Sequence, residues 1–118
     1  MSILSELVNI PGVICAGEYS YRGDRFTCKG QIDDEQARQA SIMCRATTMS
    51  VSMQASMLGT FCKDCGFDPG KGWIVKGPQL TVCVIANVFC FINEAEGSLN
   101  QVLGHMRQSL GDLSNDLV

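Results

Sequence analysis

The chain has 118 residues and a mass of 12.8 kDa, the size of one domain. Its hydrophobic fraction of 46% suffices for a single core, and its charged fraction of only 18% excludes intrinsic disorder as the main state. Its 9 basic and 12 acidic residues give a net charge of -3, which excludes the basic surplus of a general nucleic-acid binder. We expect a single domain over residues 1–118, with an ordered core at about 2–110 and a frayed tail at 111–118.

Secretory and membrane-spanning segments are not recognisable in the sequence. The longest apolar run, residues 82–92, is interrupted by Asn87 and is too short to cross a bilayer. The N-terminus has neither the basic region nor the apolar stretch of a secretory signal. We therefore expect a cytoplasmic protein that does not insert into membranes. In that reducing compartment, five cysteines are expected to be free thiols that mostly pack as small hydrophobic residues: Cys15, Cys28, Cys44, Cys83 and Cys90.

The N-terminal part of the chain predicts a short helix and a β-hairpin. Ser2 can cap a helix with one apolar side, and the Pro-Gly pair at 11–12 ends it. Residues 13–19 and 25–29 are typical of two strands. Arg-Gly-Asp at 22–24 joins them, and we interpret this tripeptide as turn chemistry rather than as an integrin-recognition motif.

A long helix is predicted next. Asp33 and Gln36 form a capping-box pattern, and the absence of Pro, and of Gly before Gly59, predicts a helix of about 25 residues over 34–61. The helix has two apolar stripes: small or branched residues that suit packing on a sheet, and a second stripe rich in methionine. The first is Ala37, Ala40, Cys44, Thr47, Val51, Ala55 and Leu58, and the second is Ile42, Met43, Ala46, Met49, Met53 and Met57.

Two stripes leave one face of this helix to explain. A chain of 118 residues cannot surround so long a helix on all sides, so we favour a partner over a wholly buried helix. Methionine is also common at adaptable binding surfaces.

The remaining sequence predicts three strands and a helix. The strands are expected at 73–76, at about 80–86 and at 88–93. We place the last break near Asn87 because asparagine tolerates the left-handed backbone of a tight hairpin. Ser98 and Gln101 form a second capping box before an amphipathic helix. The predicted fold is α+β, a three-layer α/β/α sandwich: a five-stranded antiparallel sheet with the long helix on one face and the two terminal helices on the other.

Several short motifs occur in a characteristic order. They are Leu-x-x-Ile-Pro-Gly-Val at 7–13, Ala-Gly-Glu at 16–18, Lys-Gly at 29–30, Met-Cys at 43–44, Lys-Gly-Trp at 71–73 and Val-Cys-Val at 82–84 with Asn-Val at 87–88. With the order of elements, they resemble the Roadblock/dynein light chain superfamily, of the profilin-like or longin-like fold, from residue 2 to about 110. The motif set is most similar to a prokaryotic Roadblock-related family of unknown function.

This resemblance implies a non-catalytic interaction or regulatory module. Such domains commonly form homodimers through the long helix and an edge strand, and several are platforms or regulators of small Ras-like GTPases. Carried onto this chain, the resemblance assigns six residues to a dimer interface: Met43, Met49, Met53, Met57, Trp73 and Val75. The expected partners are a second copy and another protein, with a small GTPase as one candidate. We expect no catalytic residue, cofactor or bound metal.

Cys62-x-x-Cys65 is the strongest chemical motif, and it supports an alternative function. Two thiols at this spacing suit a redox dithiol, although the negative end of the preceding helix disfavours a thiolate. Lys63 favours that thiolate and Asp64 opposes it. Three interpretations stay open: structural thiols, a redox or sensing pair, and a metal site shared by two motifs across a dimer axis.

Two weaker features do not predict chemistry. Residues 66–72 resemble a phosphate loop, but the glycine spacing is too short and the loop leads into a strand. The single histidine, His105, is expected to be a surface or packing residue of the last helix.

Overall fold

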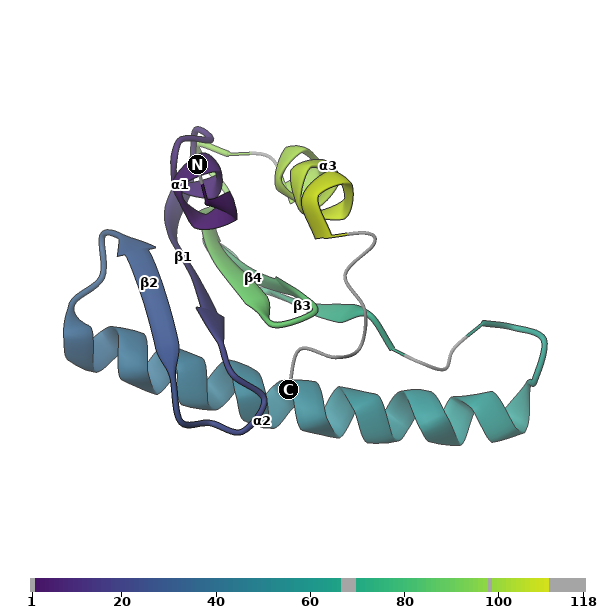
Figure 1. Ribbon diagram of the computed structural model, residues 1–118. Helices are drawn as coiled ribbons and strands as arrows, with labels where there is room; N and C mark the ends of the chain where they lie inside the picture. The colour runs from purple at the N-terminus through teal and green to yellow at the C-terminus, as the bar shows by residue number, and fades with distance from the viewer. Residues whose placement is uncertain (1, 67–69, 98, 111–118) are drawn as a thin grey trace.

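The computed structural model describes residues 2–66, 70–97 and 99–110 (Figure 1). Three helices and five strands follow one another along the chain. They are α1 (Ile3–Val8), β1 (Val13–Tyr19), β2 (Phe26–Gly30), α2 (Asp34–Phe61), β3 (Gly72–Lys76), β4 (Leu80–Ile85), β5 (Val88–Asn93) and α3 (Leu99–Leu110). The predicted element order and the α+β fold class are confirmed.

The five strands form one sheet in the order β2-β1-β5-β4-β3. Each pair of neighbours is antiparallel, as predicted, and β2 and β3 lie at the two edges. The central pair, β1 with β5, joins segments from opposite ends of the chain, with Ala16 opposite Cys90. This long-range pairing holds the two hairpins in one sheet.

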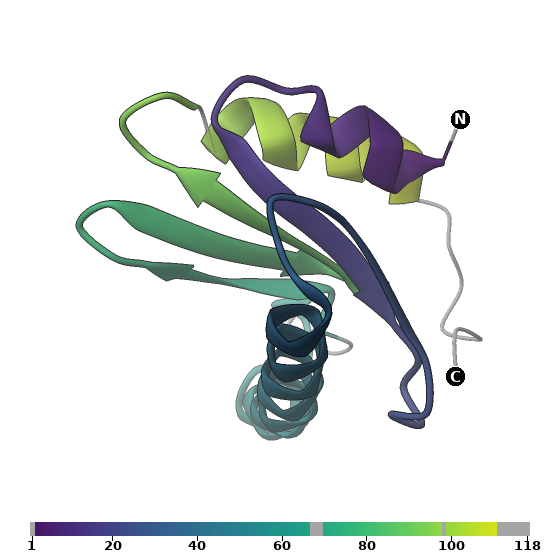
Figure 2. The same ribbon diagram turned by 90° about the vertical axis from the view of Figure 1, so that its left-hand side faces the viewer.

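The helices cover the sheet in two separate layers. Figure 2 shows α1 and α3 side by side on one face and α2 on the other. The core beneath α1 and α3, called here the α1/α3 core, consists of Leu4, Leu7, Ala16, Cys83, Val88, Cys90, Ile92, Val102 and Met106. The core beneath α2, called the α2 core, consists of Tyr19, Ala40, Cys44, Val84 and Phe89.

The predicted caps determine where the helices begin. The Ser2 side chain accepts from the Ser5 backbone N–H, and Asp33 and Gln36 form the full capping box of α2. The second capping box rested on Ser98, which lies outside the described residues, as does the tail at 111–118. Within the described ranges, no helix is long and apolar enough to cross a membrane.

The tight turn between β4 and β5 differs from the prediction in one respect. The left-handed residue is Ala86, with φ of 57°, and not Asn87. Asn87 instead uses its side-chain amide to donate to the Tyr19 carbonyl at 2.9 Å. Asparagine therefore serves here to tie the hairpin to β1, a contact between residues far apart in sequence.

Candidate functional site

The inner face of α2 approaches the sheet closely because its residues are small. Ala37, Ala40, Ser41, Cys44 and Ala55 are buried there. Most of the predicted sheet-facing stripe behaves as expected. The exception is Leu58, whose side chain is 43% exposed, because the end of α2 extends beyond the edge of the sheet (Figure 1).

The opposite face of α2 carries the large apolar side chains. This surface, called the methionine face, consists of Ile42, Met43, Ala46, Met49, Met53 and Met57. Exposed fractions rise from 44% at Met43 to 68% at Met53 and 70% at Met57. At about 100° per residue, most of these positions lie opposite the buried stripe. The described part of the chain therefore leaves the methionine-rich stripe uncovered.

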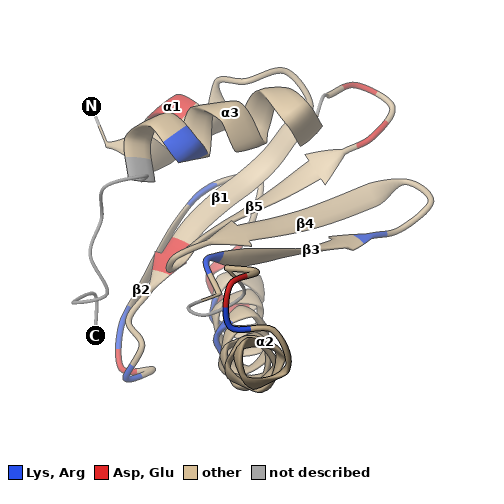
Figure 3. Ribbon diagram, turned by 90° about the vertical axis from the view of Figure 1, so that its right-hand side faces the viewer, with Lys and Arg blue, Asp and Glu red and all other residues tan. Residues whose placement is uncertain are grey.

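The composition of α2 marks this face as unlike an ordinary solvated helix surface. Residues 46–61 contain no charged side chain, and the C-terminal turns of α2 are uniformly tan in Figure 3. A helix in contact with water normally carries charged residues on its outer face. Sequence reasoning missed Phe61, the last residue of α2, which lies beyond the methionine face and is 90% exposed. The absence of charge from 46 to 61 is the signal that could have found it.

A hydrogen-bonded node fixes α2 on the sheet. The Trp73 indole N–H on β3 donates to the Thr48 hydroxyl oxygen on α2 at 2.8 Å. The same oxygen lies 2.6 Å from the Tyr19 hydroxyl on β1. Burial raises the pKa of Tyr19 to about 12 despite this hydrogen bond, so the phenol is neutral at physiological pH.

Trp73 and Val75 have different surroundings, although both were assigned to the dimer interface. Trp73 is half-buried between β3 and α2, where it anchors the helix. Val75 is 56% exposed and lies on the same side of the sheet, since side chains alternate along a strand. Because β3 is an edge strand next to α2 (Figure 3), its outer backbone edge adjoins the helix layer. The structure thus places the β3 edge beside the helix that carries the methionine face.

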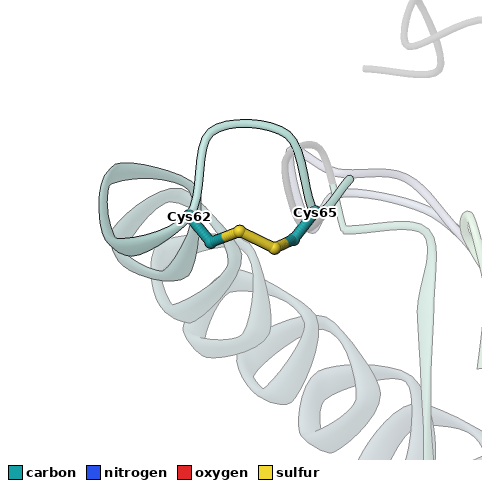
Figure 4. Close-up of a disulfide and its surroundings, with 2 residues drawn as sticks. All are labelled: Cys62 and Cys65. Atoms are coloured by element: carbon teal, nitrogen blue, oxygen red, sulfur yellow. A yellow bond between two sulfur atoms is a disulfide. The ribbon is translucent and has the colours of Figure 1, made fainter.

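Cys62 and Cys65 are joined by a disulfide at the end of α2 (Figure 4). Their Cα atoms lie 5.5 Å apart, and Cys62 is the C-cap, whose N–H bonds to the Leu58 carbonyl. Cys62 is half-buried and Cys65 is exposed. The structure thus shows the pair in its oxidised form, and the three interpretations of its role stay predictions.

The other five cysteines are free thiols, four of them buried. Burial, reinforced by neighbouring thiols, raises the pKa of Cys15 to about 11 and that of Cys44 to about 12. Buried thiols that resist ionisation are poor nucleophiles.

The two weaker features hold no developed site. His105 Nε2 lies 3.3 Å from a Glu6 carboxylate oxygen, and this contact joins α3 to α1. Gly72 begins β3 directly, so no helix N-terminus follows the glycine-rich loop, and residues 67–69 of that loop lie outside the described residues. Within the part of the chain that the structure describes, no three His, Cys, Asp or Glu side chains group as metal ligands.

Comparison with known proteins identifies a family and a fold. The family described as "Uncharacterized conserved protein (DUF2173)" matches residues 3–108. Among curated proteins, none matches the sequence.

Solved structures resemble the chain over nearly its full length. The gliding protein MglB from Thermus thermophilus and a structure described as MglB with tetrameric arrangement each have a TM-score of 0.73 at 13% identity, covering 91% of this chain and 79% of that chain. A Roadblock/LC7 domain from Streptomyces avermitilis has a TM-score of 0.55 at 15% identity, covering 92% of this chain and 95% of that chain. Identities this low establish a shared fold, which confirms the Roadblock resemblance at that level. The chain therefore belongs to the DUF2173 family and has the fold of the MglB and Roadblock/LC7 domains.

Proposed function

We propose that this protein is a non-catalytic, homodimeric interaction module, assembled through the methionine face and the edge of β3. The observation that carries the proposal is the exposed methionine face, where Met49, Met53 and Met57 are each more than half exposed. Soluble domains rarely leave a contiguous apolar surface of this kind in water, and a larger patch typically marks an interaction site.

A second copy of the chain suits this surface for two reasons. In a two-fold dimer the same patch meets itself, and a face without charge suffers no like-charge repulsion on doing so. The β3 edge is also self-compatible, since two copies of one strand can pair antiparallel across a two-fold axis. Self-association of a protein with this fold is described for MglB in its tetrameric arrangement, which supports the proposal.

The dimer would present a composite surface to another protein. The Roadblock resemblance implies platforms or regulators of small Ras-like GTPases, and MglB is described as a gliding protein. We therefore propose a protein partner for this module and take a Ras-like GTPase as the first class to test.

The dimer is tested by size-exclusion chromatography with light scattering at micromolar concentration. The wild type is expected at twice 12.8 kDa. Met49→Asp should elute as a folded monomer, because a buried unpaired charge is costly at an interface while Met49 is 53% exposed in the single chain. Gln108→Asp adds the same charge to an exposed site of α3 and should remain dimeric. A monomeric wild type, or a Met49→Asp dimer as tight as the wild type, would contradict the proposal.

The protein partner is tested by affinity capture from the native cell, followed by mass spectrometry. Wild type and monomeric Met49→Asp are compared side by side. Enrichment of a Ras-like GTPase by the wild type supports the proposed class. A captured set identical for both variants argues against a partner that requires the dimer.

A further inference from the structure

We propose that Cys62 and Cys65 form a reversible thiol–disulfide exchange site whose reaction partner is a protein dithiol of the thioredoxin class. The structure joins these two cysteines and leaves the other five as free thiols. This inference stands independently of the homodimer, because the exchange chemistry needs only a single chain.

The disulfide is accessible to a second protein. Cys65 and its neighbours Lys63 and Asp64 are exposed, and Cys62 is half-buried. Apart from its chain neighbours, no described residue has a heavy atom within 4 Å of the position that a Cβ of Gly66 would take. An attacking thiolate can therefore reach the Cys65 sulfur without displacing core residues.

The disulfide adds little to the stability of the fold. It closes a ring over a sequence separation of only 3, from the last turn of α2 to the residues that follow. Stabilisation by a disulfide grows with the length of chain that it closes. A ring this short links no two elements of the fold, so the bond can open while the sheet and its helices persist.

The exchange is a balanced two-electron reaction. A partner thiolate attacks the exposed Cys65 Sγ, the Cys62–Cys65 bond breaks, and Cys62 leaves as a thiolate that takes up a proton. The partner's second thiol loses its proton and attacks the partner sulfur of the mixed disulfide, which releases Cys65 as a thiolate that is protonated in turn. Two electrons and two protons move from the partner to this chain, and the partner ends as a disulfide.

The position of Cys62 favours a dithiol over a monothiol as reductant. The negative end of the α2 dipole lies beside Cys62 and disfavours its departure as a thiolate. With a monothiol, Cys62 readily closes the ring again. A second thiol on the same partner completes the reaction at high effective concentration.

An apolar docking point adjoins the disulfide. Phe61 precedes Cys62 and is 90% exposed, and Leu58 is 43% exposed one helical turn earlier. An exposed aromatic side chain is a frequent anchor of protein contacts. A protein reductant would use this point, whereas a small dithiol would not need it.

The test uses the full chain, dithiothreitol, and reduced thioredoxin as the protein dithiol. After each treatment, accessible thiols are alkylated without unfolding and counted by intact mass. Reduction is expected to expose two additional thiols, which disappear on exposure to oxidised glutathione. The double variant Cys62→Ser, Cys65→Ser should gain none, and the same concentration of monothiol should expose far fewer.

The role of Phe61 as a docking point is tested by the rate at which each reductant opens the disulfide. Phe61→Ala should slow reduction by thioredoxin about tenfold, while leaving reduction by dithiothreitol unchanged. Equal rates with thioredoxin for wild type and Phe61→Ala would remove Phe61 from the proposal.

Two results would overturn the exchange site itself. One is a reduced pair that does not close again with oxidised glutathione. The other is stoichiometric zinc that protects both thiols from alkylation, as in a shared metal site. Light scattering on the oxidised and reduced chain reports the dimer separately, so failure of one proposal is distinguishable from failure of the other.

Discussion

The two faces of the sheet are covered in opposite ways. On one face, α1 and α3 direct large side chains inward, and Leu7, Val102 and Met106 are fully buried. On the other face, α2 directs alanine, serine and cysteine inward and its methionines outward. The α1/α3 layer buries its large apolar side chains within one chain. The α2 layer has two apolar sides, of which only the inner one is buried.

The length of α2 explains why its outer side needs a partner. The helix has 28 residues and a rise of about 40 Å, which equals the 40 Å extent of the molecule along its longest axis. No other helix or strand within the described residues covers this outer side. Small residues on the inner side of α2 let the helix approach the sheet closely. Hydrogen bonds through Thr48 fix the orientation of the helix on the sheet.

The largest expected effect compares a substitution in the α1/α3 layer with one on the outer side of α2. Leu7→Ala should lower the free energy of unfolding by about 3 kcal/mol, since it leaves a cavity in the α1/α3 core. Met53→Ala should change it by less than about 0.5 kcal/mol, because Met53 is 68% exposed. Urea unfolding measures both, in the Met49→Asp background so that dimer formation does not contribute.

A large loss for Met53→Ala in that background would show that the chain itself covers its methionine face. In the wild-type background, the same substitution should instead weaken the dimer. Sedimentation equilibrium separates the two effects.

The second prediction concerns how α2 is held on the sheet. Thr48→Val should lower the free energy of unfolding by about 2 kcal/mol, because the Trp73 indole N–H and the Tyr19 hydroxyl lose their common hydrogen-bond partner. Thr48→Ser keeps the hydroxyl and should cost clearly less. Chemical denaturation and Trp73 fluorescence together report the stability and the local environment. A larger loss for Thr48→Ser than for Thr48→Val would mean that the Thr48 methyl group, not its oxygen, anchors α2.

The third prediction is an alkaline weakening of the α2 layer. The pKa of Cys44 is raised to about 12 by burial, so above pH 9 the unfolded chain releases this proton before the folded chain does. Stability from this group is complete below about pH 9 and is lost as the pH rises toward 12, by about 1.4 kcal/mol per pH unit. Cys44→Ala removes this loss, so its stability should approach that of the wild type between pH 9 and 11. Urea unfolding measures both proteins across this pH range. A difference in stability between the wild type and Cys44→Ala that stays the same at every pH would contradict the burial of this thiol.

Local signals in the sequence predicted the elements well. The bounds 34–61 of the long helix and its Asp33 cap follow from neighbouring residues alone, and the structure confirms them. The hairpin near Asn87 was placed within one residue, but the left-handed position falls on Ala86. That detail depends on the Asn87 amide reaching Tyr19, 68 residues away, which no local pattern reveals.

The candidate site was predictable in part for the same reason. Helical periodicity separates the methionine face from the buried stripe, and the structure leaves that face exposed. Periodicity along a short strand does not say which side meets a helix, so the burial of Trp73 against Thr48 could not be foreseen. Nor does Cys-x-x-Cys spacing fix the oxidation state, which depends on the helix end and its exposure.

The smallest expected effect tests whether the dimer interface lies on α2 or on α3. Gly104 lies within α3 and is exposed, and beyond its own helix backbone no described residue has a heavy atom within 4 Å of where a Cβ would stand. Gly104→Ala should raise the free energy of unfolding by about 0.8 kcal/mol through helix propensity alone. Because α3 completes its layer without a partner, the variant should also keep the wild-type mass in light scattering. A gain in stability with loss of the dimer would move the interface from α2 to α3, and would reverse the comparison between the two faces.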